Sequence, residues 1–187
     1  MKRCGLMLLP ALCIPLSAAP YAVDLKPAST TIDWTLDSVL HTVHGTFQLK
    51  RGSIVFDPDT GAASGEIVVD TASAESGNGA RDRKMHDSVL ESVKYPEAVF
   101  TPSRIEGKLN LNGSSDIKLQ GTFRIHGAAH ELTLDVKSQI AGGQINADLT
   151  FGIPYVAWGM KDPSTFVLRV SKTVQLTAHV AGAITRR

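Results

Sequence analysis

Two histidines three residues apart, His41 and His44, are the side chains whose type and spacing first suggest chemistry. A pair of imidazoles can bind zinc or copper. On a β-strand, however, residues three apart point to opposite faces, so His41 would share the apolar face with Val43 while His44 faces the other way. No third ligand is evident in the sequence. A structural role is favoured, and a metal-binding or redox accessory role for the pair is kept as an alternative.

Two further histidines, His126 and His130, bracket a predicted hairpin loop around Gly127, where exposed histidines are common and usually inert. Their spacing of four suits a shared metal ion only on a helix, and Gly127 disfavours a helix. The four histidines could form a metal site only by converging in three dimensions.

A basic stretch at residues 81–84, Arg-Asp-Arg-Lys, begins a predicted helix. Arg81 or Lys84 could pair with a phosphate or carboxylate headgroup at a cavity mouth. The alternative is a solvated first turn, in which Asp82 lies near the positive end of the helix and Arg81 makes a weak surface ion pair. Farther along, Tyr155, Trp158 and Met160 could line an entrance or plug the end of the fold.

The sequence contains no motif that predicts catalysis. A nucleophile elbow, a P-loop, a His-Glu-x-x-His helix and a dinucleotide-binding glycine pattern are all missing from it, so we expect a protein that is not an enzyme. The formal net charge is +1, and no basic stripe indicates nucleic-acid binding.

The N-terminus has the pattern of an export signal. Lys2 and Arg3 precede an apolar run, and Ser17-Ala18-Ala19 supplies the small residues of a cleavage site. The run is too short to span a membrane. We therefore expect a signal peptide at residues 1–19, a single mature domain at residues 20–187 and a periplasmic or secreted location. Both cysteines lie inside the signal, which leaves the mature domain without thiol or disulfide chemistry.

From about residue 29 onward, apolar and polar residues alternate with the period of two that is typical of half-buried strands. Short turns separate the strands, which indicates an up-and-down antiparallel meander that closes on itself to cover its apolar face. We predict an eight-stranded antiparallel β-barrel, mainly β, with one short helical insertion. The expected strands include residues 32–36, 43–49, 67–69, 117–125, 132–136, 145–155 and 166–180.

The helical insertion is expected within residues 71–96, where the alternation breaks. Met85, Val89 and Val93 recur at helical spacing inside residues 81–93, and Pro96 ends the segment. We expect this short amphipathic helix to lie over one end of the barrel.

Several blocks resemble the YceI family. They include Gly45-Thr46-Phe47, Gly79-Ala80-Arg81-Asp82 with Met85, Tyr95-Pro96-Glu97-Ala98-Val99-Phe100 and Gly121-Thr122-Phe123-Arg124-Ile125-His126-Gly127. The resemblance implies an extended lipocalin-like barrel with an inserted helical loop, exported from the cell, whose apolar tunnel binds polyisoprenoid chains. It also implies a structural or mouth-forming role for Arg81 and Asp82. Residues 151–166 depart from the family pattern, which predicts that one end of the tunnel is reshaped.

We therefore expect a non-catalytic binding protein that holds an isoprenoid-like lipid, with no cofactor beyond that lipid and no nucleic-acid partner. A ligand-free envelope stress or interaction module, with a filled interior, is a third hypothesis, and a homodimer is left open. His41 and Arg81 are the candidate headgroup contacts. The predicted lining comprises Phe47, Ile67, Val69, Phe100, Phe123, Leu134, Leu149 and Phe151.

Overall fold

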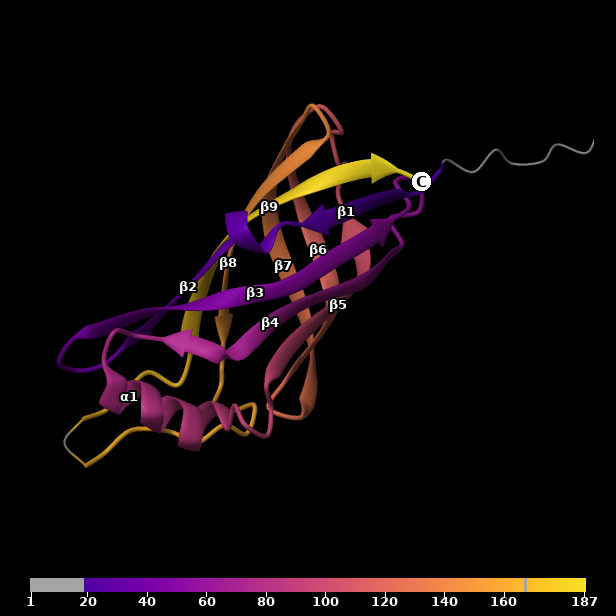
Figure 1. The fold of residues 1–187 in the computed structure, drawn as a ribbon. Helices are drawn as coiled ribbons and strands as arrows, with labels where there is room; N and C mark the ends of the chain where they lie inside the picture. Colours follow the sequence, from indigo (N-terminus) through magenta and orange to yellow (C-terminus); the bar gives the residue numbers. More distant parts are fainter. Residues whose placement is uncertain (1–18, 167) are drawn as a thin grey trace, which may run out of the picture.

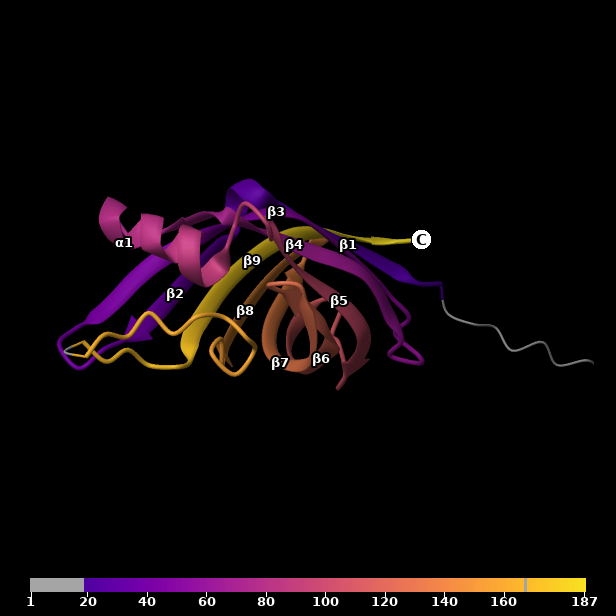
Figure 2. The ribbon, with the colours of Figure 1, turned by 90° about the horizontal axis from the view of Figure 1, so that it is seen from below.

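The structure is a computed structural model that describes residues 19–166 and 168–187. Nearly all of the predicted signal peptide, residues 1–19, therefore lies outside the described residues. Nine strands of the described chain form one antiparallel sheet that curves round and closes (Figures 1 and 2). The strands are β1 (Tyr21–Leu25), β2 (Thr31–Asp37), β3 (Thr42–Phe56), β4 (Ala63–Glu75), β5 (Glu97–Glu106), β6 (Gly113–Ile125), β7 (Ala128–Ala141), β8 (Gln144–Ile153) and β9 (Val174–Arg186).

The nine strands fill eight positions, because β1 and β2 share one position between β3 and β9. β1 pairs with the last residues of both neighbours, and β2 pairs with the first part of β3 and β9. A short 3-10 turn at Pro27–Ser29 separates the two strands, since proline has no N–H to donate to the ladder. The predicted eight-stranded antiparallel barrel is confirmed. The first strand, β1, lies before the point where the sequence pattern becomes clear.

Apart from the 3-10 turn between β1 and β2, which lies along the wall, chain direction assigns each connection to one of two ends of the barrel. The closed end holds the β3–β4, β5–β6 and β7–β8 turns and both ends of the described chain. It is filled by a small apolar cluster in which Val23, Phe56, Ile140 and Ile184 are buried. The mouth end holds four connections, residues 38–41, 76–96, 126–127 and 154–173.

The helical insertion crosses the mouth end, as predicted, but it is shorter and less regular than residues 81–93 (Figure 1). An α-helix, α1 (Gly79–Lys84), begins where the Asn78 side chain accepts hydrogen bonds from two backbone N–H groups. It continues as the π-helical turn η2 (Met85–Leu90), and Glu91 then turns left-handed at φ 46°. Val93 lies beyond this end and is fully exposed, so its place in the helical pattern was wrong.

The end of η2 is fixed to the barrel by His86. Its Nδ1 lies 2.7 Å from the Ser92 hydroxyl, and its Nε2 lies 2.9 Å from the Ala74 carbonyl of β4. Both ring nitrogens are thus occupied by partners within the fold. This arrangement holds the helical segment against the mouth end of β4.

The long connection between β8 and β9 corrects two predicted strands. β8 ends at Ile153 because Pro154 cannot donate to the ladder, and β9 begins only at Val174. The described part of residues 154–173 is a loop whose one strand-like contact is the bridge between Ser38 and Val170. Among the described residues, no helix is long and apolar enough to cross a membrane.

Candidate functional site

A cavity of about 570 Å³ occupies the barrel interior and extends to the mouth end. All nine strands, α1, η2 and the 154–173 loop contribute to its wall. The wall is almost entirely apolar, because every strand turns its period-two hydrophobic face inward. The packed cluster at the closed end limits the cavity on that side, so its polar lining residues concentrate toward the mouth.

All ten residues that the sequence suggested as ligand contacts lie on this wall. The two candidate headgroup contacts, His41 and Arg81, line it at the mouth end. Their role in binding stays a prediction; His41 reaches the wall from the β2–β3 turn and Arg81 from α1. The eight apolar residues are Phe47, Ile67, Val69, Phe100, Phe123, Leu134, Leu149 and Phe151.

Other lining residues were not singled out from the sequence. Trp34 and Leu176 sit on the same inward faces and could have been found by the same alternation rule. Met85 and Val89 line the cavity from η2 at helical spacing. Leu168 falls within the predicted strand 166–180, yet it reaches the wall from the 154–173 loop without belonging to any strand.

Two cations, Arg81 and Lys84, stand at the rim of the apolar wall. The Arg81 guanidinium donates to the Ser76 hydroxyl at 2.7 Å and to the Ser76 carbonyl at 3.0 Å. The Ser76 hydroxyl in turn donates to Asp82. Lys84 Nζ donates to the Pro163 carbonyl at 3.0 Å, which ties α1 to the loop across the mouth. Neither cation forms an ion pair with any residue that the structure describes.

The His41–His44 pair is split between the two sides of the barrel wall. His41 is exposed at the tip of the β2–β3 hairpin and borders the cavity mouth. His44 lies on the outer surface, where its Nδ1 is 3.2 Å from the Thr35 hydroxyl. Across the described residues, no group of three or more His, Cys, Asp or Glu side chains is placed to hold a metal ion.

The second pair of histidines is arranged differently from the prediction. The hairpin turn consists of His126 and Gly127 alone, with φ of 50° and 78°, and β7 starts directly afterwards. His130 therefore belongs to the strand rather than the loop. Its ring stacks on Trp158 with centroids 4.0 Å apart, which joins the start of the 154–173 loop to β7.

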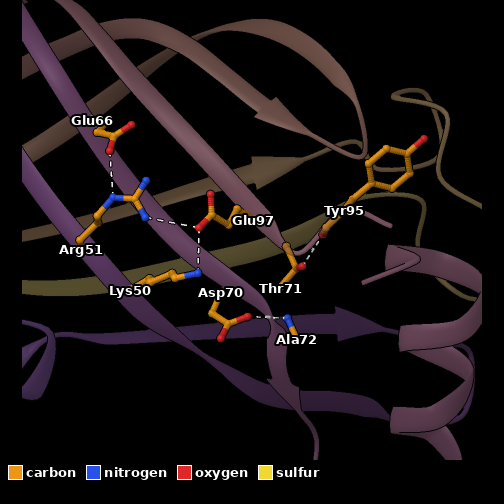
Figure 3. Close-up of polar contacts among 8 residues, drawn as sticks. All are labelled: Lys50, Arg51, Glu66, Asp70, Thr71, Ala72, Tyr95 and Glu97. Atoms are coloured by element: carbon orange, nitrogen blue, oxygen red, sulfur yellow. Dashed lines mark hydrogen bonds and ion pairs between the residues drawn. The ribbon is translucent and has the colours of Figure 1, made fainter. Parts of the chain in front are cut away.

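The polar groups of the wall mostly have partners within the fold. The buried Thr71 hydroxyl donates to the Tyr95 carbonyl at 2.5 Å (Figure 3). The Tyr155 hydroxyl donates to the Ser171 carbonyl at 2.8 Å, and burial raises the pKa of Tyr155 to about 12. Trp34 Nε1 is buried without a hydrogen-bond partner among the described residues. Apart from the rim cations, the cavity thus presents a neutral surface.

On the outer surface, an ion network joins three neighbouring strands (Figure 3). Glu97 on β5 lies 2.9 Å from Lys50 and 3.3 Å from Arg51, both on β3. Arg51 also contacts Glu66 on β4 at 2.9 Å. The Lys50 ammonium, followed by Arg51, holds the pKa of the Glu97 carboxyl below its usual range. The network points away from the cavity and braces the wall behind it.

Together these features define a closed eight-stranded antiparallel barrel with one apolar cavity and a helical insertion over its mouth. The chain belongs to the YceI-like domain family, whose sequence model matches residues 21–181. No curated protein matches the chain in sequence.

Solved structures with this architecture are similar to the chain across most of its length. BcnA of Burkholderia cenocepacia aligns with a TM-score of 0.69 and 21% identity, over 84% of this chain and 99% of that one. A polyisoprenoid-binding domain from Saccharophagus degradans, described as implicated in plant cell wall breakdown, aligns with a TM-score of 0.68 and 16% identity. The alignment covers 90% of this chain and 99% of that one. The Campylobacter jejuni YceI protein aligns with a TM-score of 0.55 and 19% identity, over the whole of both chains.

Proposed function

We propose that the protein is a non-catalytic carrier that encloses the apolar tail of an isoprenoid-like lipid in its barrel. The observation that carries the proposal is the apolar cavity with two rim cations that form no ion pair with any described residue. Apolar burial contributes about 0.8 kcal/mol for each CH₂ group removed from water, so a long hydrocarbon tail needs few polar contacts to bind. The Saccharophagus degradans relative, whose domain binds polyisoprenoid, supports the choice of an isoprenoid tail.

The size of the cavity suits a tail of moderate length. A cavity of about 150 Å³ accommodates one benzene ring, so the cavity here has room for roughly four rings, or about twenty-four carbon atoms. That space corresponds to about four or five isoprenoid units. The headgroup would then lie at the mouth, close to Arg81, Lys84 and His41.

The proposed carrier acts outside the cytoplasm, in the periplasm or after secretion. This part of the proposal rests on the N-terminal pattern of Lys2 and Arg3, the apolar run and Ser17-Ala18-Ala19. A hydrophobic lipid cannot cross an aqueous compartment alone, and enclosure of its tail removes the apolar surface that would otherwise drive aggregation. The open cavity also favours the carrier over the alternative of a filled interaction module.

The test is binding of geranylgeraniol, an isoprenoid alcohol of matching length, to the chain that starts at Pro20 and contains every strand of the barrel. Native mass spectrometry should detect a complex of one lipid per protein. The Leu149→Trp variant fills part of the cavity and should weaken binding by about tenfold or more, because it displaces several methylene groups of the ligand.

A matched control places the same indole one residue farther along β8. Thr150 is exposed on the outer face, so Thr150→Trp should leave binding unchanged. Equal binding by both variants, or a parent protein that stays lipid-free in the presence of excess geranylgeraniol, would overturn the carrier. A native purification from the producing organism, without detergent, should additionally yield a bound mass that extracts into organic solvent.

A further inference from the structure

Exposed apolar side chains gather at the tip of the mouth end. Val39 and Leu40, at the turn of the β2–β3 hairpin, are 65% and 72% exposed, and Phe166 in the 154–173 loop is fully exposed. Only two other large hydrophobic residues of the described chain are exposed, Val93 after η2 and Leu111 at the closed end. Isolated exposed hydrophobic residues are ordinary, whereas neighbouring ones on projecting segments indicate a contact surface.

The hairpin and the loop form one connected projection. Val39 N–H donates to the Arg169 carbonyl at 3.1 Å, and Ser171 N–H donates to the Asp37 carbonyl at 2.8 Å. A β-bridge between Ser38 and Val170 lies between these two bonds. Figures 1 and 2 both show the two segments side by side at the far tip of the molecule, beyond α1. The apolar tips therefore belong to a single docked unit.

This projection is continuous with the cavity. Ser38, His41 and Val170 line the cavity mouth, while Val39 and Leu40, next to them in sequence, point to solvent. The loop repeats the arrangement, because Leu168 lines the cavity and Phe166 is exposed. The apolar side chains of the tip therefore lie within one or two residues of the cavity lining on both segments.

Basic residues dominate the segments around the mouth. The four mouth connections, residues 38–41, 76–96, 126–127 and 154–173, contain seven basic and four acidic side chains. Residues 19–187 as a whole contain seventeen basic and eighteen acidic ones, so positive charge is concentrated at this end. Lys and Arg side chains are attracted to an anionic bilayer, and apolar tips flanked by basic residues are typical of interfacial insertion.

We infer that the mouth end docks on the surface of an anionic phospholipid bilayer, with Val39, Leu40 and Phe166 inserted among the headgroups. The cavity then faces the hydrocarbon layer, and a lipid tail moves between bilayer and barrel without crossing water. This use of the surface rests on the proposed carrier function, whereas the docking itself does not.

The test is flotation of the chain from Pro20 onward with vesicles made of equal parts phosphatidylcholine and phosphatidylglycerol. The parent protein should float with these vesicles and should float less with phosphatidylcholine alone or at high salt. The double variant Val39→Ser/Leu40→Ser should weaken association by about tenfold for each lost side chain that inserts. Phe166→Ser, on the other segment, should weaken it by a similar factor.

The matched control is Leu111→Ser, which removes an exposed leucine at the closed end and should leave flotation unchanged. Equal flotation of the double variant and the parent would overturn the inference. So would a parent protein that ignores vesicles but changes from dimer to monomer on Val39→Ser/Leu40→Ser, because the surface would then join two copies of the chain.

A separate readout distinguishes this inference from the carrier function. In vesicle-free solution, Val39→Ser/Leu40→Ser should bind geranylgeraniol as the parent does, because neither side chain lines the cavity. The same variant should accept the lipid from vesicles more slowly. Vesicle association without geranylgeraniol binding would retain the docking surface and overturn the carrier, and the reverse result would retain only the carrier.

Discussion

Tyr155 connects the beginning of the 154–173 loop to its end. Its phenol donates to the Ser171 carbonyl at 2.8 Å, and the ring is buried where the loop meets the cavity. Burial raises its pKa to about 12, with the negative charge of Asp162 adding to the effect. Because the folded protein resists ionisation of this phenol more than the unfolded chain does, the group stabilises the fold fully below about pH 10. The contribution disappears as the pH rises from about 10 to about 12.

Replacement of Tyr155 by Phe should reveal both parts of this role. Near neutral pH the variant should be less stable by about 1 kcal/mol, since the half-buried Ser171 carbonyl loses its donor. At alkaline pH the parent pays the cost of ionisation and the variant does not, so the difference should shrink. Urea unfolding of both proteins at about pH 8 and about pH 11 measures this difference. A difference that stays constant or grows with pH would contradict the assignment.

Gly45 on β3 allows the Trp34 ring and the end of β4 to approach the β3 backbone closely. It pairs with Trp34 across β2 and β3, and a Cβ at this position would lie 2.1 Å from the Glu75 carbonyl and 2.3 Å from the Trp34 ring. Because glycine has no side chain, the Trp34 indole can lie against β3 at this position while Glu75, at the end of β4, stays paired with Thr46. The position of Trp34 in the cavity wall thus depends on a neighbouring glycine.

The Gly45→Ala variant should lower the free energy of unfolding by about 1–3 kcal/mol, because neither the backbone carbonyl nor the indole can move without disturbing the wall. Gly79→Ala is the matched control. Gly79 is the first residue of α1, and a methyl group there meets only the end of the Arg83 side chain at 3.9 Å. We expect that variant to be neutral or more stable by up to about 1 kcal/mol. Urea unfolding monitored by indole fluorescence compares the two, and equal losses would contradict the steric explanation.

At the scale of the whole molecule, strand alternation explains why much of the barrel was predictable. The inward position of Phe47, Phe123 and Leu149 follows from a period of two that each strand carries in its own sequence. The rule fails where pairing depends on distant partners. Leu168 and Val170 flank the polar Arg169 as alternating strand residues do, yet the described part of their segment pairs only with the tip of the β2–β3 hairpin.

Turn geometry accounts for a second failure of prediction. A five-residue loop at 126–130 would leave His130 in solvent, whereas the observed two-residue turn makes it a strand residue that faces Trp158. Turn length depends on whether His126 tolerates a positive φ, which composition does not reveal. The predicted helix, residues 81–93, was too long for a related reason, because the left-handed Glu91 turns the chain before Val93.

β7 carries two buried residues in different surroundings, one beside the cavity and one at the closed end. Ile140 is packed on all sides at the closed end, with 1% exposure, whereas Leu134 borders the open cavity. Ile140→Ala should therefore lower the free energy of unfolding by about 2–5 kcal/mol, the usual cost of a cavity in a packed core. Leu134→Ala should lower it less, because its side chain already lacks packing partners on the cavity side.

For geranylgeraniol affinity the order should reverse, with a loss of about tenfold for Leu134→Ala and none for Ile140→Ala. Urea unfolding and native mass spectrometry on the same two proteins measure both quantities. If each variant lost stability and affinity in the same proportion, the cavity wall and the closed end would be one core, and the proposed difference between them would be wrong.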